Sequence, residues 1–362
     1  MNLISIKPCD TTFFGDGNQF NFDISNIVKS KNMPYPSVFF GAIFTAMLTQ
    51  NDDFREVFFE KNKYDHEKIL KIGNIYLLDE EKGKVYIKAP MDLFVKPKGE
   101  KVFGKFEKVD EEFQSLKYDR VLYCPEDKDY VRATNKYINI NNIYDAYLKE
   151  QAIRIELKDE EQIFTKNYKV GIGMDKSTRT TEEGKLYKIE QTEFADSKWC
   201  YVVEYEIDKE YIKTPYYNKI NLKELQSGYL KLGGENKVCR FHQIHSEDIE
   251  AFNSLKIKEI KNNIFKVLFI SDSYFKESIE KVFENIGFRI IGIANDKQIY
   301  IGGYDMKGKE KGKIREMYKG YPAGTVLLLE IMNDKVSDLK SIEEEMKNSK
   351  GFNRYIVMEG RI

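Results

Sequence analysis

The sequence predicts an α+β fold built in two parts, from three observations. Short apolar and alternating stretches, such as residues 170–175 and 199–207, recur along the chain and indicate strands. The apolar stretch at residues 38–50 has the composition of a buried helix. From residue 265 onward, the pattern gives strand, helix, two strands, helix and strand, which is the order of a ferredoxin-like domain.

The N-terminal part begins with a strand near Leu3 that Pro8 ends. Pro36 then opens the apolar helix, with Ser37 as the predicted N-cap. Residues 72–90 indicate a hairpin that turns at residues 80–83. The stretch at 92–163 is irregular and charged, with scattered Pro and Gly, so we interpret it as an insertion in the first domain.

The later elements complete both domains. Residues 222–244 indicate a short helix, a turn at Gly233 and Gly234, and a strand. The predicted C-terminal strands and helices are strands at 265–271, 288–294, 298–306, 324–331 and 354–360, and helices at 273–287 and 337–349. We therefore predict two tandem ferredoxin-like (RRM-like) domains, residues 1–246 with a large insertion and a protruding β-hairpin, and residues 247–362.

The protruding hairpin lies at residues 169–190. Val170, Ile172 and Met174 alternate with polar or glycine positions and indicate its first strand. The connecting segment, DKSTRTTEEG, sets Lys176 and Arg179 among four hydroxyl side chains, a composition that suits sugar-phosphate contacts. The alternative is a solvated hairpin with no ligand.

Charge and composition bound the function. Lys and Arg number 58 against 59 Asp and Glu, a net charge of -1, which argues against a strongly cationic nucleic-acid binder but leaves room for a local basic groove. Four scattered cysteines form no disulfide framework. Because the start resembles no signal peptide and no apolar run approaches a membrane span, we expect a cytoplasmic protein without membrane contact.

Few residues offer acid-base or metal chemistry. Cys239, His242 and His245 have the spacing of metal ligands, but on a strand Cys239 and His242 point to opposite faces, so we expect no metal. His66, in a charged stretch, is predicted to lie on the surface. The carboxylates near the hairpin, Asp175, Glu182 and Glu183, suit either Mg²⁺ or salt bridges within the arm, and we favour the salt bridges.

Six motifs in order resemble one family, the RAMP-superfamily third subunit of the Cmr complex, which is the RNA-guided type III-B CRISPR effector. The motifs are PCDTTFFGDGNQF (8–20), PSVFFGAIFTAM (36–47), KVGIGMDKSTRTTEEGKLY (169–187), YLKLGGENK (229–237), IGGYDM (301–306) with MYKGYPAGTVLLLE (317–330), and GFNRYIVME (351–359). The third matches the family's V-G-I-G-x-D-x-x-T-R-T-A-E-E-G-x-L-Y at nearly every fixed position. Gly15 and Asn18 stand where the family has basic residues, which shifts the expected RNA contact toward Arg179.

The resemblance implies a non-catalytic subunit for antiviral defence that needs no cofactor. It would bind the crRNA 5′ handle, dock on the large polymerase-like subunit and touch the first backbone RAMP subunit; a mononucleotide at the large-subunit interface is open. The predicted RNA contacts are Lys169, Lys176, Thr178, Arg179, Thr180, Lys231, Gly233, Gly234 and Arg354. Two alternatives stay open: a histidine-dependent RAMP endoribonuclease that processes CRISPR repeat RNA, and a bridging subunit without RNA contact.

Overall fold

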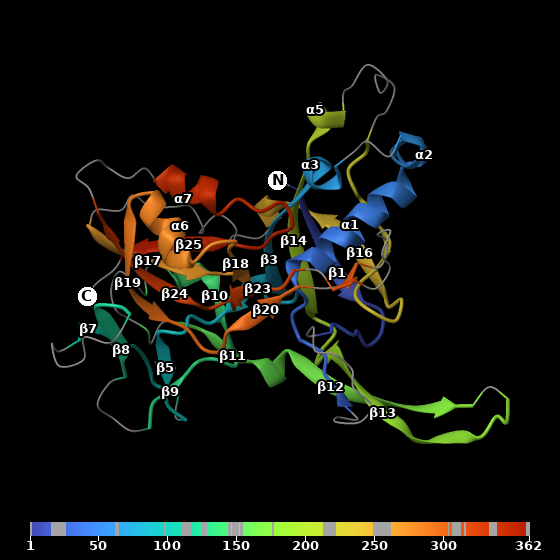
Figure 1. Cartoon of the computed structure of the whole chain (residues 1–362), viewed down its shortest axis with the longest axis horizontal. Coiled ribbons are helices and arrows are strands. Elements are labelled where there is room, and N and C mark those ends of the chain that lie inside the picture. The colour runs from blue at the N-terminus through green and yellow to red at the C-terminus, as the bar shows by residue number, and fades with distance from the viewer. Residues whose placement is uncertain are drawn as a thin grey trace. The chain divides into compact units, whose positions relative to one another are not determined.

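The computed structural model has a mixed α+β fold that is rich in strands (Figure 1). It describes residues 2–15, 27–61, 65–97, 99–109, 117–124, 129–143, 146, 152, 155–175, 177–212, 222–248, 262–302, 304–305, 313–314, 316–332 and 339–359. Contacts divide the chain into unit 1 (Met1–Gly73, Leu78–Glu81, Glu160–His245) and unit 2 (Asn74–Leu77, Lys82–Asp159, Ser246–Ile362). The tandem ferredoxin-like arrangement, with its insertion in the first domain, stays a prediction.

Unit 1 is built on an antiparallel sheet. Its strands, in spatial order, are β3 (Leu70–Asp79), β14 (Trp199–Ile207), β1 (Asn2–Pro8), β16 (Val238–Ile244) and β15 (Ser227–Lys231). Ile6 on β1 lies opposite Tyr201 and Phe241, and all three are buried. Successive residues of β14 from Trp199 to Val203 are all buried, so both faces of this strand are covered.

Helix α1 (Pro36–Gln50) packs against this sheet, and its Phe39 ring meets the edge of Tyr201 with centroids 5.4 Å apart. The N-cap is Tyr35 and makes no side-chain cap bond, so the prediction of Ser37 as N-cap is wrong. Proline suits the first position because it has no N–H to satisfy there. The remaining helices of unit 1 are α2 (Asp52–Lys61), α3 (His66–Ile69), α5 (Lys209–Ile212) and a 3₁₀ turn (Glu160–Gln162).

The short helix predicted after residue 222 is absent, since residues 222–226 form no regular element. Their backbone donors have partners elsewhere. Lys223 N donates to Asn51 Oδ1 at 3.2 Å, and Leu225 N donates to Tyr205 OH at 3.2 Å. These tertiary contacts replace the hydrogen bonds that a helix would supply.

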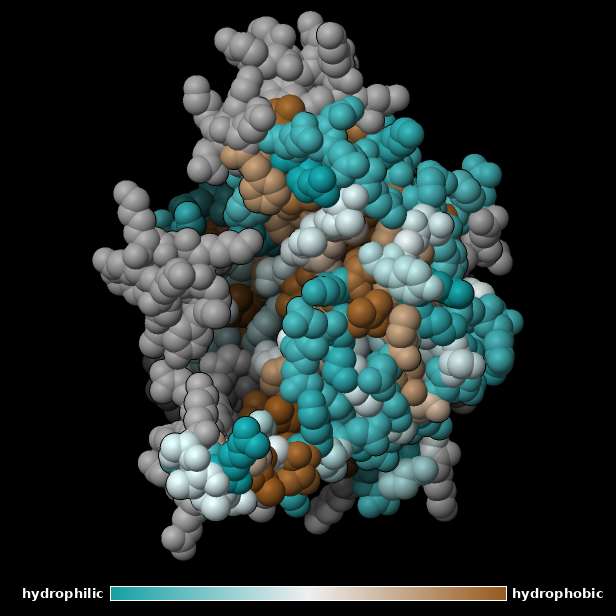
Figure 2. Space-filling model, turned by 90° about the vertical axis from the view of Figure 1, so that its right-hand side faces the viewer, coloured by the Kyte–Doolittle hydropathy of each residue, from teal (hydrophilic) through white to brown (hydrophobic). Residues whose placement is uncertain are grey.

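The hairpin is the most distinctive feature of unit 1. Strand β12 (Phe164–Met174) pairs with β13 (Thr181–Phe194), with a bulge between Ile172 and Met174, and β2 (Ile27–Val28) runs parallel to β13. Figure 1 shows the ribbon, in green, running out from the sheet. Every second residue of β12 from Tyr168 to Met174 is at least half exposed to solvent. Figure 2, which faces the side toward which the hairpin extends, shows hydrophobic residues scattered among hydrophilic ones on this face.

Unit 2 contains a four-stranded antiparallel sheet in the order β19 (Phe288–Ala294), β24 (Val326–Ile331), β17 (Ile264–Phe269) and β25 (Tyr355–Glu359). Helices α6 (Ile279–Asn285) and α7 (Leu339–Glu345) follow β17 and β24, so the predicted order of main elements is present. Phe265, Phe283 and Ile342 lie in its buried core. Helix α6 begins later than predicted, because residues 273–274 form β18 and Ser278 caps the helix.

The remaining strands of unit 2 are short. They are β4 (Lys84–Lys88), β10 (Lys136–Asn139) and β11 (Leu157–Asp159) side by side; β5 (Leu93–Val95), β6 (Lys101–Phe103) and β9 (Val131–Arg132); β7 (Lys105–Lys108) and β8 (Arg120–Tyr123); β18 (Ser273–Tyr274), β20 (Ile299–Ile301) and β23 (Tyr318–Tyr321); and β21 (Tyr304–Asp305) and β22 (Lys313–Ile314). Two 3₁₀ turns, Ile140–Asn142 and Ser246–Asp248, complete the list. The predicted hairpin at 72–90 is present as β3 and β4 with its turn where expected. Among the described segments, no helix has the length and apolar character needed to cross a bilayer.

Candidate nucleic-acid interface

The tip of the hairpin is a turn organised by one carboxylate. Asp175 Oδ1 accepts hydrogen bonds from Ser177 N at 2.7 Å and Thr178 N at 2.9 Å. The backbone closes the turn, because Asp175 N donates to Thr180 O and Arg179 N donates to Asp175 O. An aspartate that bonds to the N–H groups two and three residues ahead holds a tight turn without help from the protein core.

Arg179 sits at the exposed end of this turn with a φ of 54°, a conformation uncommon for residues with a side chain. Its guanidinium makes no ion pair or hydrogen bond with any other described side chain. The neighbouring hydroxyls of Thr178 and Thr180 lie 2.7 Å apart and are also exposed. The structure thus brings three of the predicted contacts together at the tip; Lys176 lies outside the described residues.

The turn makes the acidity of Asp175 testable. The hydrogen bonds from Ser177 and Thr178 hold the pKa of Asp175 well below the ordinary aspartate value of 3.8. Because the pKa of Asp175 is lower in the folded state than in the unfolded state, its ionised form stabilises the turn at pH values above the ordinary aspartate pKa. This stabilisation is lost as the pH falls through the lower, folded-state pKa. We expect carboxyl NMR to show Asp175 still mostly ionised at pH 3.8. A carboxyl that is half protonated at that pH would contradict this turn geometry.

At the base of the hairpin, a polar network joins β12 and β13 to the turn between β15 and β16. Glu235 Oε2 lies 3.6 Å from Lys169 Nζ and accepts a hydrogen bond from Gln191 Nε2 at 2.7 Å. Gln191 Oε1 in turn accepts from Thr11 Oγ1 at 2.8 Å. Lys237 Nζ also donates to Thr11 Oγ1. Lys169, on the hairpin, and the predicted glycine turn are therefore neighbours.

The glycines of that turn are needed for packing within the chain. Gly233 has a φ of 78°, and a Cβ there would lie 2.5 Å from Phe13 O. Gly234 N donates to Phe13 O at 2.9 Å. Lys231, at the end of β15, donates to Asn236 Oδ1 at 3.2 Å. The close backbone approach that the glycine pair permits is made by residues 13–14.

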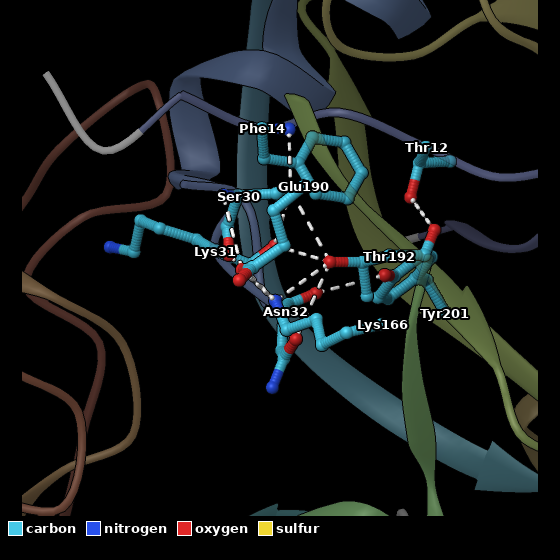
Figure 3. Close-up of polar contacts among 9 residues, drawn as sticks. All are labelled: Thr12, Phe14, Ser30, Lys31, Asn32, Lys166, Glu190, Thr192 and Tyr201. Atoms are coloured by element: carbon cyan, nitrogen blue, oxygen red, sulfur yellow. Dashed lines mark hydrogen bonds and ion pairs between the residues drawn. The ribbon is translucent and has the colours of Figure 1, made fainter. Parts of the chain in front are cut away.

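A second network fixes the hairpin to the N-terminal segments, and we call Thr12, Ser30, Lys166, Glu190 and Thr192 the anchor cluster (Figure 3). Lys166 Nζ donates to Ser30 O at 2.7 Å and Thr192 Oγ1 at 3.0 Å, and lies 3.0 Å from Glu190 Oε1. Thr12 and Thr192 form a backbone bridge, and Thr12 Oγ1 donates to Thr192 O. Tyr201 OH reaches Asn32 O beside it.

The sequence analysis missed the anchor cluster. Lysine, glutamate, serine and threonine at these positions have ordinary surface composition, and they come from segments more than a hundred residues apart. Their only local signal is the strand pattern of β13, in which Glu190 and Thr192 alternate with Gln191. Pairing between distant segments brings the five together, so local periodicity carries no sign of the cluster.

Arg354 belongs to unit 2 and is tied into its own loop. Its backbone N donates to Ser271 Oγ and its Nη2 donates to Asn348 O, both at 2.9 Å. The adjacent Asn353 has a φ of 60°, and its Oδ1 accepts from Tyr274 N. These contacts give the arginine a structural partner, and its contact with RNA stays a prediction.

His66 and His242 contact side chains of their own unit, whereas His245 is exposed. His66, exposed on α3, contacts the rings of Phe40 and Phe44, and His242 shares hydrogen bonds with Ser5 Oγ. Cys239 is buried while His242 is partly exposed, as expected for successive faces of β16. No group of three or more His, Cys, Asp or Glu within the described residues could hold a metal ion.

The geometry defines a strand-rich α+β protein with an exposed polar hairpin tip. The family model described as CRISPR-associated protein (Cas_Cmr3) matches residues 4–359. The chain therefore belongs to the Cas_Cmr3 family. No curated protein matches it.

Two solved structures share the fold. One is a chain in the cryo-EM structure of the Type III-B Cmr-beta bound to cognate target RNA and AMPPnP, with a TM-score of 0.52, 16% identity and 99% of each chain covered. The other comes from the Type III-B Cmr-beta bound to cognate target RNA, with a TM-score of 0.51, 17% identity, and 98% of this chain and 96% of that chain covered. At this identity the likeness concerns the fold.

Proposed function

We propose that this protein is a non-catalytic subunit of a type III-B CRISPR effector and binds the 5′ handle of the guide RNA. The observation that carries the proposal is the hairpin tip. Asp175 folds the tip from within, so the exposed Arg179 is left without a described side-chain partner. A cation and hydroxyls presented in this way suit phosphate and 2′-OH contacts.

The proposed mechanism is positioning. Arg179, Thr178 and Thr180 contact the RNA backbone at the tip, and Lys169 contacts it nearer the base. The anchor cluster holds the ribbon in place, so that the handle meets a preformed surface. The Cas_Cmr3 family and the fold shared with chains of RNA-bound Cmr-beta structures support this assignment. The protein partners we propose are the large polymerase-like subunit and the first backbone RAMP subunit.

Replacing Arg179 by alanine tests the proposal. Losing a charge-assisted hydrogen bond at an exposed site is expected to weaken guide retention about 10-fold. The variant is assembled with its genomic neighbours, washed at rising salt, and the retained guide is quantified. Because the Arg179 side chain is exposed and has no partner among the described side chains, its replacement by alanine leaves no packing defect, and a melting curve checks this.

Arg55→Ala is the matched control, since Arg55 is an exposed arginine of unit 1 that pairs with Asp52 on α2. We expect its complex to retain guide RNA as the parent does. Equal retention by the Arg179→Ala and parent complexes at raised salt would refute the role of the tip. Incubation of the same complexes with repeat RNA tests the nuclease alternative, which cleavage lost on His242→Ala would favour.

A further inference from the structure

The outer face of the β15–β16 ribbon presents an aromatic ring beside two cations. Tyr229 on β15 is 68% exposed and precedes the buried Leu230. One face of this strand is therefore exposed to solvent and the other is buried. Arg240 on β16 lies directly opposite Tyr229, and Lys231 lies opposite Val238. Arg240 and Lys231 are both exposed. Residues opposite one another on antiparallel strands are close enough to form one surface.

The two positive charges on this face are uncompensated. Lys231 Nζ donates only to the neutral Asn236 Oδ1, and the guanidinium of Arg240 has no ion pair or hydrogen bond among the described residues. By contrast, Lys7, on the neighbouring strand β1, is neutralised by Glu80 at 2.6 Å. An anion is therefore the occupant that complements the face electrostatically.

We propose that this face binds unpaired nucleotides of single-stranded RNA, with a base stacked on Tyr229 and phosphates held by Arg240 and Lys231. Aromatic rings and arginine planes on open sheet faces stack bases in this way. The apolar part is small, one ring and the 44% exposed Val238, which is too little for a protein interface. The inference rests on the proposed function and extends it from the hairpin to the sheet.

The face is continuous with the hairpin. The turn that joins β15 to β16 carries Glu235, which contacts Lys169 of β12 and Gln191 of β13. RNA bound at the base of the hairpin would therefore meet this turn next, followed by Lys231 and Tyr229 along β15. A single strand could contact the tip, the base and the ribbon in succession.

The test uses the full chain and a fluorescein-labelled oligouridylate of about ten nucleotides, a length that spans one stacking platform and its flanks. Tyr229→Ala is expected to raise the Kd about 5- to 100-fold. Tyr229→Phe keeps the ring and should bind within about twofold of the parent, whereas Tyr229→Leu should bind as poorly as alanine. Arg240→Ala should lower the slope of log Kd against log salt by about one.

Tyr300→Ala is the matched control, because Tyr300 is an exposed strand tyrosine of unit 2. Parent-like binding by Tyr229→Ala or Tyr229→Leu would overturn the inference, as would loss of subunit assembly without loss of RNA binding, which would assign the face to a protein. If Arg179→Ala weakens RNA binding and the Tyr229 variants do not, the sheet contact is refuted while the proposed function stands. If neither Arg179→Ala nor the Tyr229 variants weaken RNA binding, the sheet contact and the proposed function are both refuted.

Discussion

Lys266→Met is expected to destabilise unit 2 by about 3 to 5 kcal/mol, since it removes one partner of a buried ion pair. Lys266 Nζ lies 2.8 Å from Asp92 Oδ2, and the side chains are 5% and 0% exposed. Lys266 is on the central strand β17, and Asp92 precedes β5. The substitution would leave the Asp92 carboxylate buried without its lysine, which costs far more than losing an exposed pair.

Chemical denaturation followed by circular dichroism measures this effect. The double variant Lys266→Met with Asp92→Leu serves as the control. Replacing both charges by apolar groups removes the unpaired buried carboxylate and should recover most of the lost stability. A single variant as stable as the parent would show that the pair contributes nothing. A double variant that falls as far as the single one would show that side-chain shape matters more than charge.

Lys166→Met is expected to loosen the hairpin and to cost about 1 to 3 kcal/mol of stability in unit 1. Lys166 donates to Ser30 O and Thr192 Oγ1, and it neutralises the mostly buried Glu190. Its loss removes the donor to the Ser30 carbonyl oxygen and leaves the Glu190 carboxylate without its positive partner. Guide retention should fall as well, although Lys166 itself lies away from the tip.

Hydrogen exchange of the β12 and β13 amides measures the loosening, and a melting curve gives the loss of stability. Lys188→Met is the matched control, because Lys188 lies on the same ribbon opposite Val170 and makes no hydrogen bond or ion pair with another described side chain. We expect parent-like exchange in that variant. Unchanged exchange in Lys166→Met would mean that strand pairing alone holds the ribbon.

Local pattern located the longer strands, whereas the short strands β5 to β11 lie in the stretch that we interpreted as irregular. Residues 199–207 and 288–294 form β14 and β19 with the predicted bounds, because their β-branched and aromatic residues favour an extended backbone. Helix ends were less predictable. Helix α1 begins at Pro36 without a side-chain cap, and α6 begins after its local cap Ser278. The backbone donors of the helix predicted after residue 222 bond instead to Asn51 and Tyr205.

In the candidate site, too, features set by neighbouring residues were predictable and features set by strand register were not. An exposed polar turn at the tip was predictable because Asp175, Thr178 and Arg179 are neighbours in sequence, and their contact with RNA stays a prediction. The packing of Gly171 against the Tyr187 ring, which a Cβ would approach to 2.2 Å, depends on the register of β12 against β13. The exposed pair of Tyr229 and Arg240 likewise depends on the register of β15 against β16, which no local pattern sets.

Crosslinking of the guide to the assembled complex tests the central claim most directly. A guide RNA with 4-thiouridine placed through its 5′ handle is irradiated in the complex, and the crosslinked peptides are identified by mass spectrometry. We predict that the handle crosslinks to residues 177–181. These crosslinks should be lost when the handle is replaced by an unrelated sequence that the complex does not retain. Handle crosslinks confined to other subunits, with none on the hairpin, would contradict the account.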